Sequence, residues 1–182
     1  PAHQVVVLGH LIAEGNLCHP HGAYFYTQDE EQLRDYITHL EQFTNTEASV
    51  STHKSTYSVY SRRFDRQQPT ELVTWLRQLG VWGKTASEKA LPPEVFQLTN
   101  DQIALLIARL WDSDGHLNEK GRSLFYATAS ERLARQLQQL MLRLGIVTRV
   151  RDVTVSYQDG RIGYRVFVTG YENIAEFSVP TR

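Results

Sequence analysis

The chain is poor in cysteine and has no long hydrophobic run. Its one cysteine, Cys18, excludes a disulfide framework among the 182 residues and fits a reducing compartment. The longest apolar run near its start, Val5–Leu8, is too short for a membrane span, and no signal-peptide pattern precedes it. An apolar content of 41% with 21% charged residues is typical of a soluble globular chain. We therefore expect a cytoplasmic protein with one core or two small ones.

The chain also lacks an excess of charge of either sign, since its formal net charge is −1. The charges are nevertheless segregated. Six acids against one arginine lie between residues 29 and 47, in a stretch that reads as helical. Four bases lie in each of the ranges 50–66 and 148–168, and both ranges read as β. Bases concentrated on strands could form one basic face that binds phosphate, although an ordinary mixed-charge surface fits the same counts.

Two segments of the chain correspond to each other at an offset of 100 residues. Val7–Gly15 and Ile107–Gly115 are both apolar segments that run into an acid and then a glycine. Each is followed by a β-like stretch, a helix and a longer β region. These lie at 23–26, 30–43 and 49–64 in the first half, and at 123–127, 130–144 and 148–168 in the second. The chain is therefore built twice.

Hydrophobic spacing predicts the elements of each repeat. Gly145 ends a run of apolar residues at helical spacing, which are Leu133, Leu137, Leu140 and Leu144. Ser130 suits the N-cap of that helix. Near the end of the chain, apolar Tyr164, Val166 and Val168 alternate with Arg165 and Phe167, as in a half-buried strand, and Asp159-Gly160 predicts a hairpin turn before it.

These patterns predict an α+β fold of two pseudo-symmetric αββαββα repeats. In each repeat, a layer of helices covers one face of an antiparallel sheet. We place the repeats at 1–82 and 99–182 and a connector at 83–98, and we expect the last helix, which starts within 171–177, to be truncated.

Each motif segment is predicted to be a helix, at 4–13 and 101–113, that ends at a carboxylate followed by a glycine. An acid in the last turn of a helix is unfavourable by roughly 0.3–1 kcal/mol, because the helix C-terminus carries partial negative charge. Glu14 and Asp114 each occupy this unfavourable position, at equivalent points of the two repeats. Solvent-exposed acids without a role are one explanation, and a divalent cation between them is the one that we favour.

Small residues at helical spacing would allow the two motif helices to pack side by side about a pseudo-twofold axis. They are Gly9 and Ala13 on one helix and Ala104 and Ala108 on the other. Such packing would bring Glu14 and Asp114 together at the same end. Two carboxylates, completed by waters and phosphate oxygens, suit Mg²⁺, which can activate water and stabilise the leaving oxygen in phosphodiester hydrolysis.

At these residues the chain resembles the LAGLIDADG homing endonucleases, and specifically the two-motif, single-chain endonuclease domain of a bacterial intein. Val7–Gly15 and Ile107–Gly115 match the two dodecapeptide motifs. The stretch 83–92, with Lys89 and Pro92, resembles the Lys-x-x-Pro block between the motifs, and 142–146 resembles the block that follows the second motif. The resemblance extends from about Val5 to Phe177.

The resemblance implies a monomeric, site-specific nuclease that cuts both strands of double-stranded DNA and leaves short 3′ overhangs. Glu14 and Asp114 would be the metal-binding catalytic acids, and Lys89, or alternatively Lys84, the basic residue beside the reacting water. Mg²⁺ would be the cofactor, and Ca²⁺ or Mn²⁺ could replace it for binding. Two antiparallel sheets would form a saddle over the major groove of a long asymmetric site. The splicing parts of the intein are absent from the sequence.

The chain departs from the family pattern at three positions. Arg109 stands where a small residue is usual, so we expect the helix packing to run through Ala108 instead. His10 replaces the common aromatic residue or leucine. Asp112 adds a second acid to the second motif, and we interpret it as a polar residue near a helix end, with metal ligation as the alternative.

Alternation along the strands gives the candidate DNA-binding residues. In the first half, Ser58, Tyr60 and Arg62 are expected on one strand face, and Tyr57 and Val59 on the core face. Arginine can pair with guanine edges, and lysine or serine can hold phosphate. For each residue a plain exposed side chain is the alternative. The full set is Lys54, Ser58, Tyr60, Arg62, Arg63, Arg149, Arg151, Arg161 and Arg165.

Two features could mislead. Cys18-His19-Pro20-His21 resembles part of a zinc site, but no second pair with finger spacing exists, and we interpret it as a DNA-contacting loop. The three tryptophans, Trp75, Trp82 and Trp111, are expected in the core.

Two other functions remain open. A regulator with the same fold could bind DNA without cutting it, although intact acids in both motifs argue against this. An RNA-splicing maturase is the other, and the intein-type block between the motifs argues against it.

Overall fold

The computed structural model describes residues 1–117, 123–155 and 161–170. The first repeat contains α1 (Ala2–Glu14), β1 (Gly15–Asn16), β2 (Tyr24–Thr27), α2 (Glu30–Leu40), β3 (Glu47–His53), β4 (Thr56–Arg62) and α3 (Glu71–Gln78). After a 3₁₀ helix, η1 (Pro93–Gln97), the second repeat contains α4 (Asn100–Asp114), β5 (Gly115–Leu117), β6 (Leu124–Thr128), α5 (Glu131–Arg143), β7 (Thr148–Val155) and β8 (Arg161–Val168). The predicted αββαββ order is therefore confirmed. The predicted last helix at 171–177 and the turn at Asp159-Gly160 lie outside the described residues.

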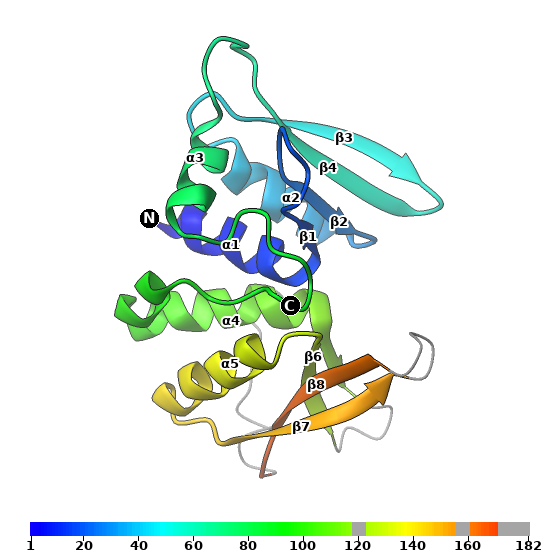
Figure 1. Cartoon of the computed structure of the whole chain (residues 1–182), viewed down its shortest axis with the longest axis vertical. Coiled ribbons are helices and arrows are strands. Elements are labelled where there is room, and N and C mark those ends of the chain that lie inside the picture. Colours follow the sequence, from blue (N-terminus) through cyan, green and yellow to red (C-terminus); the bar gives the residue numbers. More distant parts are fainter. Residues whose placement is uncertain (118–122, 156–160, 171–182) are drawn as a thin grey trace.

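Each repeat has its own antiparallel sheet, as predicted. The strand orders are β1-β2-β4-β3 and β5-β6-β8-β7, so the two sheets have the same topology. The register repeats as well, because Gly15 pairs with Phe25 in the first sheet and Gly115 pairs with Tyr126 in the second. Figure 1 shows the sheets at opposite ends of the long axis, with the β3–β4 and β7–β8 hairpins extending to the same side of the molecule.

The motif helices α1 and α4 lie side by side between the two sheets (Figure 1). Gly9 permits their close approach, because a Cβ atom there would lie 2.7 Å from the Cβ of Arg109 and 3.3 Å from the carbonyl oxygen of Leu106. The prediction that the packing avoids Arg109 is therefore wrong. Arg109 itself lies opposite Gly9, and Ala104, which we expected in the contact, is exposed.

The ends of the helices follow from local capping. Thr99 and Gln102 form a capping box at the start of α4. The hydroxyl of Ser130 accepts from the backbone N–H of Leu133, as expected for the N-cap of α5. At the other end of α5, Gly145 adopts a φ of +81°, the left-handed conformation that terminates helices. These caps fix the ends of α4 and α5.

Apolar side chains from both repeats form the core. Trp111 is buried, as predicted, while Trp75 and Trp82 are partly buried and pack against the core. Val59 faces the core. Tyr57 lies on the same face of β4, as predicted, but it is only partly buried, and its hydroxyl reaches Glu30 of α2 at the exposed edge of that face. No helix in the described parts of the chain is long and apolar enough to cross a membrane.

Candidate active site

The two acids of the repeated motifs meet at one end of the helix pair. Glu14 is the last residue of α1 and Asp114 the last of α4, and their carboxyl groups are in hydrogen-bond contact. The glycine after each acid is required by the sharp turn into the next strand. A Cβ at Gly15 or Gly115 would lie 2.3 Å from the carbonyl oxygen four residues earlier. The acid–glycine pair therefore places each carboxyl at the point where helix changes to strand.

The contact between the two acids disfavours full ionisation. Burial and the neighbouring charge of Glu14 raise the pKa of Asp114 to about 7, while Lys89 and Tyr126 act in the opposite direction. Burial is the larger cause of the raised pKa, and the charge of Glu14 adds to it. A cation would compensate that charge.

Lys89 lies beside the acids. Its side chain is buried, and Nζ donates a 2.9 Å hydrogen bond to the carbonyl oxygen of Ala13 in the last turn of α1. Burial lowers the pKa of Lys89, and the charges of Asp114 and Glu14 oppose that shift. Lys84, the alternative, is exposed. The structure thus brings Lys89 to the acid pair.

The connector that carries Lys89 is bound to α5. The hydroxyl of Ser130 donates a 2.6 Å hydrogen bond to the carbonyl oxygen of Lys89. The amide of Gln136 bonds to both the N–H and the carbonyl oxygen of Leu91, each at 2.8 Å. Lys89 therefore comes from a segment anchored to the second repeat and reaches a helix of the first.

Tyr126 is a member of the site that sequence reasoning missed. Its hydroxyl oxygen lies 3.3 Å from Oδ2 of Asp114, and its ring is buried against Trp111. The only available signal was its place in the second repeat, twelve residues after the acid.

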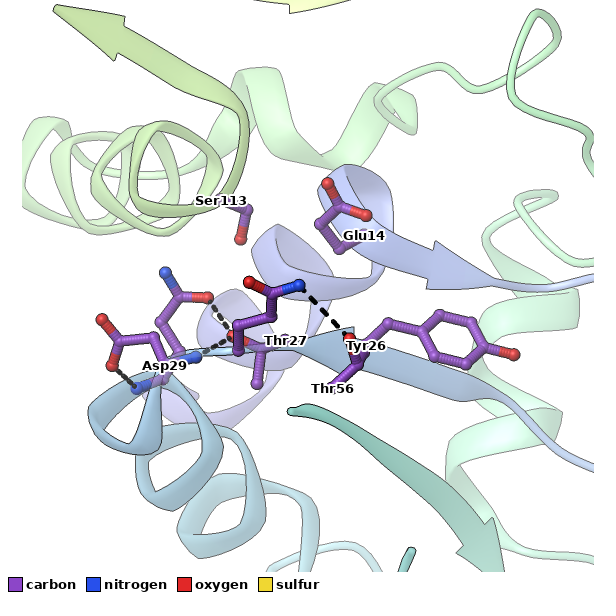
Figure 2. A pocket seen from close by; sticks show the side chains of 8 residues that line it. Glu14, Tyr26, Thr27, Asp29, Thr56 and Ser113 are labelled. Carbon is purple, nitrogen blue, oxygen red and sulfur yellow. Dashed lines mark hydrogen bonds between the residues drawn. The ribbon is translucent and has the colours of Figure 1, made fainter. Parts of the chain in front are cut away.

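A pocket of about 490 Å³ opens beside Glu14. Figure 2 shows Glu14 and Ser113 on one side of it, and Thr27 and Asp29, from the end of β2 and the start of α2, on the other. Gln32 also lines the pocket, and its side-chain amide donates a 2.7 Å hydrogen bond to the backbone carbonyl of Asp112. The pocket therefore extends from Glu14 to the first sheet.

A buried ionic cluster ties α2 to the motif helices. Arg109 donates two hydrogen bonds to the carboxylate of Asp35, at 2.7 and 3.1 Å, and Nε2 of His10 lies 2.9 Å from the same carboxylate. Burial acts to raise the pKa of Asp35, but the bonds from His10 and Arg109 lower it to about 2. Burial lowers the pKa of His10, so its ring is neutral with Nε2 as the donor. Two positions that depart from the family pattern, His10 and Arg109, thus share one partner.

The donor set fits a hard divalent cation better than zinc. In residues 1–117, 123–155 and 161–170, no three His, Cys, Asp or Glu side chains gather as a metal site. Cys18 is exposed, and the rings of His19 and His21 lie 5.9 Å apart. Two carboxylates are what Mg²⁺ typically takes from a protein when waters and phosphate oxygens complete its shell.

The two sheets present different side chains on the face away from the core. On the first sheet, Ser58, Tyr60 and Arg62 share this face, as predicted, but Arg62 is paired with Glu47 at 2.8 Å. Lys54 lies in the tight β3–β4 turn, with a φ of 45°, and Arg63 is exposed beyond the end of β4.

On the second sheet, arginines alternate with aromatic rings. Arg165 lies over the ring of Phe125 at 4.8 Å, and Arg151 over that of Phe167 at 5.7 Å. Arg149 is exposed on the same face. Arg161 begins β8, but its side chain lies outside the described residues.

The amino-acid sequence is similar to one known domain family and to segments of several longer proteins. Residues 101–178 match the profile of the LAGLIDADG-like domain. The replicative DNA helicase DnaB of Rhodothermus marinus is 33% identical over 185 residues, which cover 96% of this chain and 19% of the helicase. The replication factor C small subunit of Methanocaldococcus jannaschii is 24% identical, covering 93% of this chain and 9% of that protein. RecA of Mycobacterium bovis is 31% identical over 57% of this chain and 15% of its own length. The chain spans about a fifth or less of these relatives.

Solved structures share the fold. The homing endonuclease I-DmoI, in complex with DNA and Mn, matches with a TM-score of 0.67 at 10% identity, over 96% of this chain and 93% of its own. The N-terminal LAGLIDADG domain of WhiA matches with a TM-score of 0.61 at 11% identity, over 96% and 80%. Residues 101–178 are thus similar to a LAGLIDADG-like domain, and the chain as a whole has the fold seen in I-DmoI and in the N-terminal domain of WhiA.

Proposed function

We propose that the chain is a site-specific endonuclease that hydrolyses phosphodiester bonds of double-stranded DNA with a divalent cation, Mg²⁺ in the cell. The contact between the Glu14 and Asp114 carboxyls, at the junction of the two repeats, carries the proposal. I-DmoI has been solved with DNA together with Mn or Ca, which supports both the partner and the class of cofactor.

Each residue of the site has a role in this reaction. Glu14 and Asp114 would hold the cation, which when bound would supply an activated water and compensation of charge on the phosphate. The ammonium group of Lys89 is held in place by its hydrogen bond to the carbonyl oxygen of Ala13. It adds a positive charge next to the acid pair, from the connector between the two repeats. That charge polarises the attacking water or stabilises the extra negative charge of the transition state.

The outer faces of the two sheets bind the duplex on either side of this site. Tyrosine, serine and lysine side chains contact it in the first repeat and arginines in the second, so a single chain covers a long asymmetric target. The enzyme acts as a monomer, and one acid pair serves both strands, leaving 3′ overhangs.

We further propose that this nuclease is an inserted segment of a longer protein, as in an intein. The same segment matches a helicase, a replication factor subunit and RecA, in each case over a small share of the relative. A segment common to proteins of such different names fits an inserted nuclease better than a part of any one of their activities.

DNA binding without cleavage is the second candidate, because likeness to WhiA and I-DmoI extends to the fold and not to individual side chains. The paired carboxyls favour cleavage. Binding alone gains nothing from two acids, which repel phosphate unless a cation lies between them.

Selection from a library of randomised double-stranded sites tests the proposal. Sequences that the protein binds without cutting in Ca²⁺ and cuts in Mg²⁺ would identify the target. The two conditions would also measure binding and cleavage separately. A protein that enriches one sequence in Ca²⁺ but cuts nothing in Mg²⁺ or Mn²⁺ would be a DNA-binding protein, and the nuclease proposal would be abandoned.

A further inference from the structure

The hydroxyl of Tyr126 is held against one of the two acids. The phenol donates a 3.3 Å hydrogen bond to Oδ2 of Asp114. The ring is 1% exposed and packs against Trp111, with ring centroids 5.3 Å apart. Trp111 precedes Asp114 by one turn on α4. The same helix therefore fixes both the ring and the carboxyl that it touches.

The equivalent position of the first repeat has no hydroxyl. Phe25 pairs with Gly15 as Tyr126 pairs with Gly115, so the two rings occupy the same place in the two sheets. Phe25 is fully buried and packs against the rings of His10 and Tyr36. The second repeat thus places a phenol against Asp114, whereas the equivalent ring of the first repeat has no hydroxyl.

We propose that Tyr126 is a positioning residue of the metal site, which holds one oxygen of the Asp114 carboxylate and leaves the other for the cation. This inference rests on the proposed nuclease function. Partners that hydrogen-bond to metal ligands fix the orientation of those ligands, and their loss typically costs about 10- to 100-fold in metal affinity or activity. Because Glu14 has no equivalent phenol, the two acids contribute unequally, and Asp114 is the pre-oriented ligand.

The variant Tyr126→Phe removes one oxygen and keeps the ring against Trp111. The matched control is Tyr36→Phe. Tyr36 is also fully buried, and its hydroxyl has no hydrogen-bond partner among the described residues. Both variants delete the same atom from a buried ring, but only one deletes a contact with a proposed metal ligand.

Two binding measurements and one rate would be compared on the full chain with its selected DNA target. Calorimetry would give the Kd for Ca²⁺ in the protein–DNA complex, and gel shift in EDTA the DNA affinity without metal. Single-turnover cleavage would give the half-saturating Mg²⁺ concentration. We expect Y126F to raise the Ca²⁺ Kd and the half-saturating Mg²⁺ concentration on the order of 10-fold. DNA affinity in EDTA should stay unchanged, and Y36F should match the wild type throughout.

A measurement on the wild-type protein needs no variant. With tyrosine labelled at ¹³Cζ, Ca²⁺ should shift the Tyr126 signal and leave that of Tyr36 in place. The positioning role alone would be overturned if Y126F had the metal dependence of the wild type. It would also be overturned if the Tyr126 signal did not shift while the wild type bound Ca²⁺. A wild-type protein that neither binds Ca²⁺ nor cuts DNA would instead overturn the proposed function.

Discussion

Asp114 carries a charge that the metal-free protein stabilises poorly. Its pKa is raised from 3.8 to about 7, so the folded state holds the proton more tightly than the unfolded chain does. The resulting cost to stability is absent below pH 4, grows as the pH rises towards 7 and is complete above it. We therefore predict that Asp114→Asn raises the free energy of unfolding in EDTA by on the order of 4 kcal/mol at pH 8, and by nothing at pH 4.

Urea denaturation at the two pH values measures this difference. The same variant, and Glu14→Gln, should lose DNA cleavage while keeping specific binding. An Asp114→Asn protein that is no more stable than the wild type at pH 8, or that still cuts at full rate, would contradict the assigned acid pair.

Lys89 offers a second test at a single residue. Lys89→Met keeps the apolar part of the side chain but removes the ammonium from beside Asp114 and Glu14. We predict a single-turnover cleavage rate on the order of 10²-fold lower, with little change in DNA affinity by gel shift. Lys84→Met is the matched control, since Lys84 is exposed in the same connector. A binding defect with a normal rate in Lys89→Met would make Lys89 a DNA contact.

The sequence predicted these groups with unequal success. Glu14, Asp114 and Lys89 could be found because each belongs to a motif whose residues are neighbours in sequence. Tyr126 could not, because its contact with Asp114 depends on the β5–β6 register, which places a strand residue over the end of a helix. A single tyrosine in a strand of alternating residues does not by itself predict a contact with a helix end.

At the scale of elements, α2 and α4 are joined by the Asp35–Arg109 pair. Removal of one member leaves the other charge buried and uncompensated. We predict that Asp35→Ala lowers the free energy of unfolding by about 3–5 kcal/mol near pH 7. Since the pKa of Asp35 is lowered to about 2, the wild type should lose this advantage as the pH falls from about 4 towards 2.

Glu47→Gln is the control for Asp35→Ala, because it breaks the exposed Arg62–Glu47 pair. It should cost about 0–1 kcal/mol in the same denaturation experiment. Equal losses in the two variants would show that the Asp35 cluster does not hold the helices together.

The elements themselves and the side-by-side packing of the motif helices followed from the sequence, but the part that Arg109 plays in that packing did not. Hydrophobic period, Ser130 and Gly145 located the helices to within a few residues. The helix contact was expected to run through Ala108 instead of Arg109, yet the Cβ of Arg109 lies against Gly9 while its guanidinium reaches Asp35. Asp35 lies on another helix, 74 positions away in the sequence, and no local sequence pattern predicts this pairing.

The molecule as a whole is symmetric in its backbone and asymmetric on the faces proposed to bind DNA. Along its strands the first sheet exposes tyrosine and serine, and its Arg62 is already paired with Glu47, so its exposed bases Lys54 and Arg63 lie at the two ends of β4. The second sheet exposes arginines packed over phenylalanine rings. Phosphate neutralisation should therefore come mainly from the second repeat, and the first should read the sequence through hydroxyl and aromatic contacts.

The salt dependence of DNA affinity tests whether the two sheets have these different roles. Each phosphate contact that is lost should reduce the slope of log affinity against log salt by about 0.9. We predict that Arg149→Gln, Arg151→Gln and Arg165→Gln together reduce the slope by about 2 to 3, whereas Arg62→Gln reduces it by less than about 0.5 because its charge is already compensated. Equilibrium binding to the selected target in Ca²⁺, from 50 to 300 mM salt, measures both. Equal reductions per arginine in the two repeats would mean that the sheets bind the backbone alike, and a slope near zero in the wild type would remove the basic face from the proposal altogether.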